Sequence, residues 1–117
     1  MASILYAEDE FTNRKLIEIQ LQRANLNCDL ACNGEEAWEM FQNGDYKLII
    51  LDRYMPKMNG DELARKIKQV RPDIPLIAIT SDDSDVKQLR EAGFSEIFIK
   101  PLHGREYITL IRQYLED

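Results

Sequence analysis

The sequence predicts an α/β fold, a doubly wound parallel sheet of five strands flanked by five helices. Short apolar runs alternate five times with longer segments in which apolar residues recur at helical spacing. The short runs are continuously apolar, which is typical of strands covered by helices on both faces of a parallel sheet. Because crossovers between parallel strands are right-handed, an open doubly wound sheet is the favoured arrangement for this pattern.

The first half of the chain is expected to form two strands, each followed by a helix. The strands are predicted at 4–7 and 28–32, and Asn25-Leu26-Asn27 ends the first helix. Asn33-Gly34 opens the second helix and Asn43-Gly44 closes it. The apolar stripes are Ile17, Leu21 and Ala24 in the first helix, and Ala37, Trp38 and Phe41 in the second.

Three further strands and helices are expected in the second half. The strands are predicted at 48–51, 76–79 and 97–99, and they end at Asp52, Thr80 and Lys100. A turn-rich stretch at 55–60 leads into the third helix, and the fourth helix ends at Ala92-Gly93. The fourth helix is expected to be capped by Asp82, Asp83 or Ser84. The apolar stripes are Leu63, Ile67 and Val70 in the third helix, and Tyr107, Ile111, Tyr114 and Leu115 in the fifth.

Composition and charge limit the class of protein. The chain has 117 residues, of which 44% are hydrophobic, so we expect residues 1–117 to form one domain with a packed core. Lys and Arg number 15 against 21 Asp and Glu, and the net charge of −6 argues against direct binding to nucleic acid. No apolar run approaches the ~18 residues of a membrane span, and no secretion signal is visible. We therefore expect a cytoplasmic domain that does not insert into a membrane.

The two cysteines, Cys28 and Cys32, are expected to be free. On one strand they would lie about 13 Å apart, at about 3.3 Å per residue, which is too far for a disulfide. The sequence has no second cysteine pair and one histidine, which argues against a metal site at these thiols. We expect both to be small buried hydrophobes in a reducing compartment.

The residues with the most chemistry follow four of the five predicted strands. These strands end at Glu8-Asp9, Asp52, Thr80 and Lys100. In an open parallel sheet, ligands bind outside the carboxyl ends of the strands, so these side chains are expected to converge. Crowded carboxylates cannot all stay ionised unless a cation joins them. A ligand set made only of oxygen atoms suits Mg²⁺, which accepts one or two direct carboxylates and keeps several waters.

This set of groups fits phosphoryl transfer. Asp52 is placed to act as the nucleophile, while Lys100 neutralises the incoming anion and Thr80 donates a hydrogen bond to it. The product would be an acyl phosphate on Asp52. A simpler interpretation is that the acids after the first strand are the favourable negative charge of a helix start, which suits Glu10 best.

Four motifs along the chain resemble one known family. They are Glu8-Asp9, the segment DRYMPKMNG at 52–60, Thr80-Ser81 and the segment FIKP at 98–101. In this order they are similar to the CheY-like receiver domains of bacterial two-component response regulators, and the resemblance is collinear over nearly the whole chain. Asn13-Arg14 is similar to receivers attached to hybrid sensor kinases, so the chain resembles a stand-alone receiver or one taken from a longer protein.

The resemblance implies a fold and a set of roles. The family's sheet has the strand order 2-1-3-4-5, as in flavodoxin-like folds, and Asp52 would accept a phosphoryl group from a histidine kinase or a histidine phosphotransfer protein. Asp9, Asp52 and the Tyr54 main-chain carbonyl would bind Mg²⁺ directly, with Glu8 acting through water. Thr80 and Lys100 would contact the phosphate oxygens. A downstream protein partner would bind the surface formed by residues 83–117.

Two positions depart from the family pattern, and three alternatives stay open. Glu8 stands where aspartate is usual, and Ile97 stands where the family usually has a switch aromatic. A phosphorylation-independent docking module is one alternative. A phosphohydrolase of the haloacid-dehalogenase type is another, although Tyr54 occupies the place of its second acid. A flavin or nucleotide carrier is the third, but the acids at 8–10 would repel a phosphate.

Overall fold

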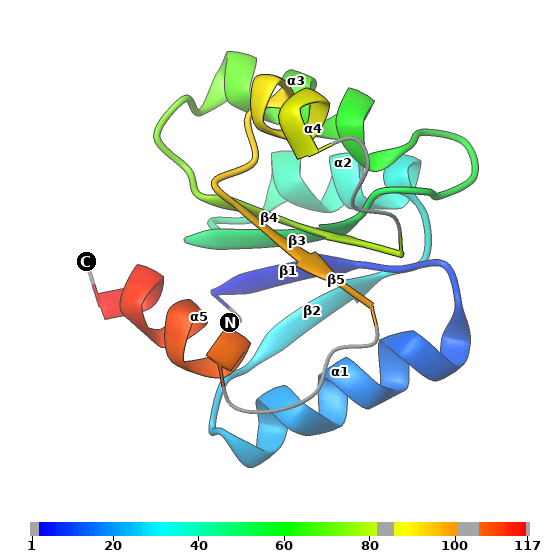
Figure 1. The fold of residues 1–117 in the computed structure, drawn as a ribbon. Helices are drawn as coiled ribbons and strands as arrows, with labels where there is room; N and C mark the ends of the chain where they lie inside the picture. The colour runs from blue at the N-terminus through cyan, green and yellow to red at the C-terminus, as the bar shows by residue number, and fades with distance from the viewer. Residues whose placement is uncertain (1–2, 82–85, 101–105, 117) are drawn as a thin grey trace.

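The structure is a computed structural model that describes residues 3–81, 86–100 and 106–116. In these residues strands and helices alternate along the chain (Figure 1). The cap predicted at Asp82, Asp83 or Ser84 lies outside them. The strands are β1 Ile4–Ala7, β2 Cys28–Ala31, β3 Leu48–Asp52, β4 Leu76–Thr80 and β5 Glu96–Ile99. The helices are α1 Phe11–Arg23, α2 Gly34–Asn43, α3 Gly60–Val70, α4 Val86–Ala92 and α5 Glu106–Glu116.

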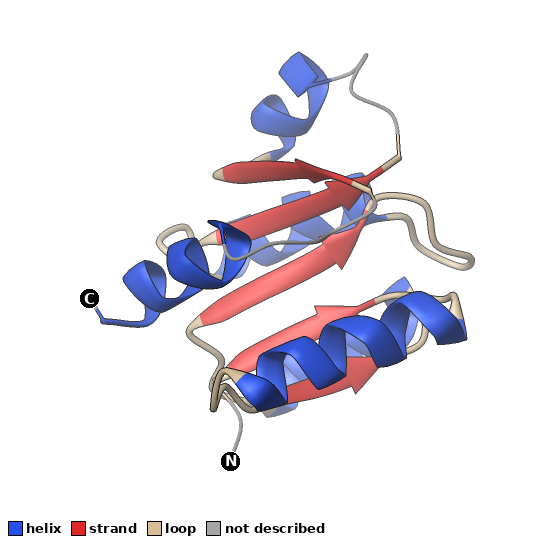
Figure 2. Ribbon diagram, turned by 60° about the horizontal axis from the view of Figure 1, so that its bottom comes forward, coloured by secondary structure: helices blue, strands red, loops and turns tan. Residues whose placement is uncertain are grey.

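The five strands form one parallel sheet in the order β2-β1-β3-β4-β5. This confirms the predicted doubly wound fold. The strand β3 lies at the centre and pairs with β1 on one side and β4 on the other. All five strands run in the same direction, so their carboxyl ends meet at a single edge (Figure 2). That edge is where the sequence places its acids and Lys100.

Each face of the sheet is covered by a separate layer of helices. In Figure 1, α2, α3 and α4 lie above the sheet, and α1 and α5 lie below it. Alternate residues of the buried strands point to opposite layers: Leu51 packs with the first group of helices, while Tyr6 and Ile50 pack with the second. Burying a large apolar side chain contributes about 1.5–3 kcal/mol, so both layers stabilise the strands that carry the site.

Local side-chain contacts set the ends of several helices. The N-cap residues of α1, α2 and α3 are Glu10, Asn33 and Asn59, and each side chain accepts a hydrogen bond from the main-chain N–H group three residues further on. Glu10 therefore lies at the helix start, as the sequence predicted, but as the N-cap residue and not as an acid of the first turn. The helix α4 ends as predicted, and the following Gly93 has a φ of +114°, which favours glycine.

Two sequence predictions on burial are wrong. Val70 was expected on the buried stripe of α3, but it is 61% exposed. The buried face of the helix continues instead from Ile67 to Arg71, which is half-buried. The Arg71 guanidinium donates to the Tyr46 carbonyl at 2.6 Å. Cys32 was expected to end a strand and be buried, but it is exposed and follows the last residue of β2. Its N–H donates to a Glu36 carboxylate oxygen at 3.0 Å. Cys28 is half-buried, and both thiols are free.

Candidate functional site

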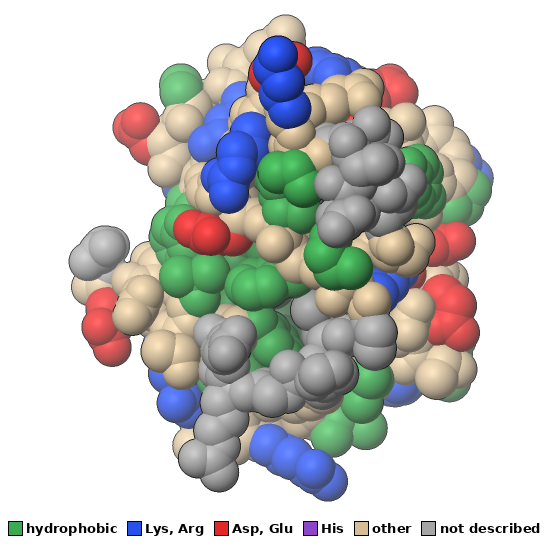
Figure 3. All heavy atoms as spheres, viewed as in Figure 1, with side chains coloured by type: hydrophobic (Ala, Val, Ile, Leu, Met, Phe, Trp, Pro, Cys, Tyr) green, Lys and Arg blue, Asp and Glu red, His purple; other side chains and the backbone are tan. Residues whose placement is uncertain are grey.

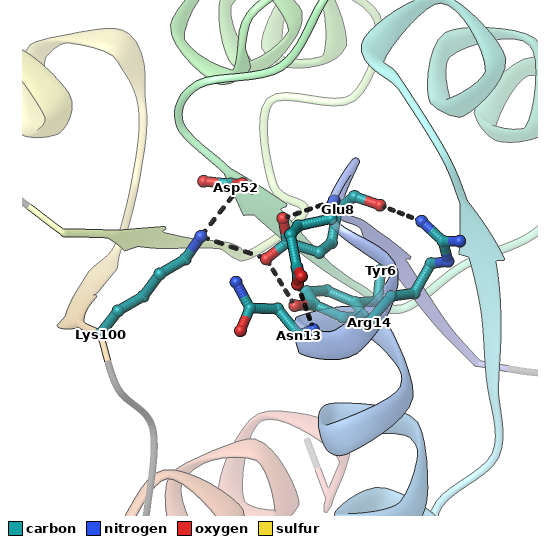
Figure 4. Close-up of polar contacts among 7 residues, drawn as sticks. Tyr6, Glu8, Asn13, Arg14, Asp52 and Lys100 are labelled. Atoms are coloured by element: carbon teal, nitrogen blue, oxygen red, sulfur yellow. Dashed lines mark hydrogen bonds and ion pairs between the residues drawn. The ribbon is translucent and has the colours of Figure 1, made fainter.

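The site lies at the carboxyl edge of the sheet, where β1, β3, β4 and β5 end. Glu8 and Asp9 follow β1, Asp52 is the last residue of β3, and Thr80 is the last residue of β4. Lys100 follows β5, and its N–H donates a hydrogen bond to the Thr80 main-chain carbonyl at 2.8 Å. The topology therefore brings together residues from distant parts of the sequence (Figure 4).

Three carboxylates converge at this edge. One carboxylate oxygen from each of Glu8, Asp9 and Asp52 lies within 4.8 Å of the others. Glu8 is fully buried and Asp52 is 3% exposed, whereas Asp9 is exposed to solvent. An all-oxygen set with one side open to water is the kind of site that suits Mg²⁺. The residues present therefore fit the predicted metal.

Lys100 bridges the two buried carboxylates. Its Nζ lies 3.2 Å from Glu8 Oε1 and 3.2 Å from Asp52 Oδ2. The sequence predicted that Lys100 would lie near the acids, and the structure places its charge between them (Figure 4). A single ammonium group thus lies within ion-pair distance of two carboxylates.

The crowding changes the proton affinities of these groups. Burial, together with a hydrogen bond and repulsion from Glu8, raises the pKa of Asp52 to about 7. Burial acts to raise the pKa of Glu8 as well. Hydrogen bonds from Asp52 and from the Glu10 N–H, together with the positive charge of Lys100, outweigh the effect of burial, so the pKa of Glu8 is lowered overall. Burial lowers the pKa of Lys100, but the two carboxylates raise it overall, so it stays charged. Without a bound metal ion, Glu8 therefore holds a proton less readily than Asp52 does.

Glu8 is held by contacts on three sides. The Tyr6 hydroxyl donates to Glu8 Oε1 at 3.3 Å, and the Glu10 N–H donates to Oε2 at 3.2 Å. The Arg14 guanidinium donates to the Glu8 main-chain carbonyl at 2.8 Å. The sequence analysis did not identify Tyr6 or Arg14 as site residues. The available signal for Tyr6 was its position two residues before Glu8, which puts both side chains on one side of the strand.

Thr80 and Tyr54 lie where their chain positions predict. Thr80 is fully buried at the end of β4. The ring of Tyr54 is 52% exposed, and the guanidinium carbon of Arg53 lies 5.1 Å from its centroid. The contacts proposed for the Thr80 hydroxyl and the Tyr54 carbonyl stay predictions.

Ile97, which stands where the family usually has a switch aromatic, and its neighbour Phe98 point to opposite faces of the sheet. Ile97 packs against the core under α2, α3 and α4. Phe98 points to the opposite core, where its ring makes an edge contact with Tyr107 at 6.2 Å between centroids. Phe98 therefore does not take the place of the aromatic that Ile97 replaces.

Comparisons with known proteins agree with this geometry. The sequence profile of the response regulator receiver domain matches residues 4–112. The transcriptional regulatory protein SrrA of Staphylococcus aureus is 29% identical over 114 residues, which cover 96% of this chain and 47% of SrrA. The chain thus spans about half the length of the curated relatives it matches.

Solved structures show the same fold. The response regulator TrrA of Thermotoga maritima, solved in complex with Mg(2+)-BeF, is 32% identical with a TM-score of 0.89, and the likeness covers 97% of this chain and 99% of TrrA. The receiver domain of a Pseudomonas aeruginosa sensor histidine kinase, solved with a magnesium ion in its active-site cleft, is 23% identical. Its TM-score is 0.90 with full coverage of both chains, and at this identity the likeness supports a shared fold and no shared function.

No helix in the described part of the chain has the length and apolar character needed to cross a membrane. The family profile covers most of the sequence, and the strand order and the motifs at the strand ends agree with it. This chain belongs to the family of response regulator receiver domains.

Proposed function

We propose that Asp52 accepts a phosphoryl group in a Mg²⁺-dependent reaction and that the domain signals through the resulting change of its surface. The observation that carries this proposal is the Asp52 carboxylate itself. It is 3% exposed, lies at the end of the central strand and is 3.2 Å from Lys100. Glu8 and Asp9 lie beside it. We further propose that residues 1–117 form one receiver domain, located in the cytoplasm.

The chemistry is an exchange of one bond to phosphorus for another. An Asp52 carboxylate oxygen forms the new O–P bond while the P–N bond of a phosphohistidine breaks, and that bond's electron pair leaves with the donor imidazole. Lys100 offsets the charge of the transferred group, and the Thr80 hydroxyl donates a hydrogen bond to one of its oxygens. Water later cleaves the acyl phosphate, which returns the carboxylate and releases inorganic phosphate. The domain catalyses only its own phosphorylation and dephosphorylation.

Four residues are proposed to hold the metal. Asp9, Asp52 and the Tyr54 main-chain carbonyl would bind Mg²⁺ directly, and Glu8 would act through a water molecule. When bound, the ion supplies positive charge that offsets the charge on the transferred group and on the crowded carboxylates. The close carboxylates of this structure and the Mg²⁺ bound by TrrA support this assignment.

The phosphodonor is proposed to be a histidine kinase or a histidine phosphotransfer protein that docks over α1. Three large apolar side chains of this helix point to solvent: Phe11 is 62% exposed, and Leu16 and Ile19 are each 43% exposed. The helix begins four residues after the end of β1, so this apolar surface lies next to the acids. Covering it would bring a partner's imidazole close to Asp52.

The output surface is proposed to lie on the described parts of residues 83–117. Figure 3 shows hydrophobic side chains that gather between β5 and α5 on one face of the molecule. Phe98 of β5 and Ile108 of α5 lie on this side of the sheet, and Ile108 and Leu110 are half-buried. Ile97 is half-buried on the opposite side of β5, and Ile99 is 41% exposed. Thr80 ends β4 and Lys100 follows β5, so a shift of these residues would move the edge of this face. A downstream protein that binds the face would then bind the two states with different affinity.

Incubation with Mg²⁺ and acetyl phosphate, followed by intact-mass measurement, tests the proposal. The wild type is expected to gain the mass of one HPO₃ group, and Asp52→Asn is expected to gain none. Asp45→Asn is the matched control, because Asp45 is an exposed acid in the loop after α2, and it should behave as the wild type. An unmodified wild type, or a phosphorylated Asp52→Asn variant, would overturn the proposal.

A further inference from the structure

We infer that Tyr6 is a positioning residue for the metal site and that it acts through Glu8. This inference rests on the proposed function, because it concerns how the chain holds one of the proposed metal residues. Tyr6 lies inside β1, is fully buried and touches Glu8 through its hydroxyl (Figure 4). It would therefore affect Mg²⁺ binding without contacting the ion.

The contacts of Glu8 leave its carboxylate little freedom. Oε1 receives the Tyr6 hydroxyl at 3.3 Å and the Lys100 ammonium at 3.2 Å, while Oε2 receives the Glu10 N–H at 3.2 Å. The Lys100 and Glu10 contacts come from the edge of the sheet. Tyr6 is the contact that comes from within β1, on the side of the α1 and α5 core.

A cavity next to Glu8 explains why that contact matters. The cavity has a volume of about 30 Å³ and is lined by Tyr6, Glu8 and Lys100 together with apolar side chains such as Leu16 and Ile79. A glutamate side chain has one more rotatable bond than aspartate. The Tyr6 hydroxyl holds the carboxylate of this longer side chain beside Lys100 rather than letting it turn into the cavity. Groups that orient a metal's ligands in this way commonly change metal affinity 10- to 100-fold when they are removed.

The first test compares two tyrosine variants by calorimetric titration with Mg²⁺. Tyr6→Phe removes only the hydroxyl, and we expect the Kd for Mg²⁺ to rise about tenfold. Tyr107→Phe is the matched control, because Tyr107 is 4% exposed and its hydroxyl has no hydrogen-bond partner among the described residues. We expect the control to bind Mg²⁺ as the wild type does. Equal affinities for Tyr6→Phe and the wild type would overturn the inference.

A second pair of variants separates positioning from a general structural effect. Glu8→Asp withdraws the carboxylate from the hydroxyl by one methylene group. In that background we expect Tyr6→Phe to change the Kd for Mg²⁺ by less than about twofold, because the contact is already lost. If Tyr6→Phe weakens Mg²⁺ binding equally in both backgrounds, Tyr6 does not act through Glu8 and the inference is wrong.

The outcomes distinguish this inference from the proposed function. If the wild type does not bind Mg²⁺, the proposed function fails, whereas an unaffected Tyr6→Phe variant overturns only the inference. Circular dichroism checks that the variants fold. If Tyr6→Phe does not fold, fluorotyrosine-labelled wild type gives the answer by NMR. Mg²⁺ should then shift the Tyr6 resonance and leave that of Tyr107 in place, and an unmoved Tyr6 resonance would contradict the inference.

Discussion

Asp52 and Glu8 place two carboxylates beside one ammonium group in a site that is largely closed to water. Each carboxylate lies 3.2 Å from Lys100 Nζ. One positive charge cannot fully compensate both, so the pair holds a proton more readily than two isolated acids would. At the scale of single residues, the metal-free site is therefore a local source of instability that a cation would relieve.

The pH dependence of stability should reveal this crowding. The pKa of Asp52 is raised to about 7 in the folded protein, above its value of about 4 in the unfolded chain. Its stabilising contribution is thus fully present below about pH 4 and is lost as the pH rises through about 7. Asp52→Asn mimics the protonated acid, so in EDTA we expect it to be more stable than the wild type by about 1–3 kcal/mol at pH 8.

Urea unfolding of both proteins between pH 4 and pH 8 measures the difference. The stability advantage of Asp52→Asn should shrink as the pH falls and should be close to zero at pH 4. A constant difference, or a wild type that is more stable at pH 8 without metal, would contradict the assigned pKa direction.

Single residues also show what the sequence could predict about the site. Glu8, Asp9, Asp52 and Lys100 were predictable neighbours, because the strand-end rule depends only on strand boundaries and on parallel pairing. Tyr6 was not, because a tyrosine within an apolar run has the pattern of a core residue. The two-residue spacing puts Tyr6 and Glu8 on the same side of the strand, but it does not specify that the hydroxyl reaches the carboxylate.

At the scale of elements, Arg53 connects the end of β3 to two helices. Its guanidinium lies 3.3 Å from Asp61 Oδ2 at the start of α3 and 3.4 Å from the Gln88 side-chain oxygen in α4. Its main chain donates to the Ile79 carbonyl of β4. Arg53 and Asp61 are both buried, so their charges depend on each other for compensation. The residue after the proposed phospho-acceptor thus ties together three elements around the site.

Breaking the buried pair should be costly. Asp61→Ala leaves the Arg53 guanidinium buried without this carboxylate, and we expect a loss of about 3 kcal/mol in the free energy of unfolding. Glu62→Ala is the control, because Glu62 is the next acid in the same first turn but is exposed, and it should lose about 0.5 kcal/mol. Urea denaturation measures both. The double variant Arg53→Met, Asp61→Leu should recover most of the lost stability, because neither charge then remains buried. Equal losses for Asp61→Ala and Glu62→Ala would show that the buried pair does not matter for stability.

The helices show where periodicity succeeds and where it fails. The stripes of α2 and α5 were predictable because their apolar residues are confined mainly to one side. In α1, Ile17 and Leu21 are buried as predicted, but Phe11, Leu16 and Ile19 are apolar and exposed. Apolar residues on both sides do not indicate which side faces the sheet, and a surface that binds a partner is one reason for such a pattern.

At the scale of the whole molecule, the described residues form two hydrophobic cores, one on each face of the sheet. The strand order and the fold class were predictable, because continuously apolar runs and right-handed crossovers leave few arrangements. The site lies at one edge of this sheet, and its side chains come from the ends of strands that separate the two helical layers. Any ligand that binds there stabilises the folded chain as a unit.

Thermal unfolding with added Mg²⁺ tests this linkage. At about ten times the Kd, the ion should stabilise the wild type by about 1.4 kcal/mol, which corresponds to a rise in Tm of about 5 °C. Asp9→Asn removes the exposed carboxylate of the cluster and should lose most of this rise. A sodium salt without divalent cations, at the same ionic strength, controls for the general effect of salt on Tm. A Tm that does not respond to Mg²⁺, or that rises equally in Asp9→Asn, would argue against the proposed ligands.

The exposed thiol of Cys32 makes the chain suitable for site-selective labelling without mutagenesis. Cys32 follows β2, the strand that pairs with β1 and so borders the acidic edge of the sheet. Cys28 is half-buried and burial raises its thiol pKa to about 11, so it is a poor nucleophile at neutral pH. A maleimide fluorophore would therefore attach first at Cys32, where its emission could report metal uptake and phosphate turnover in real time.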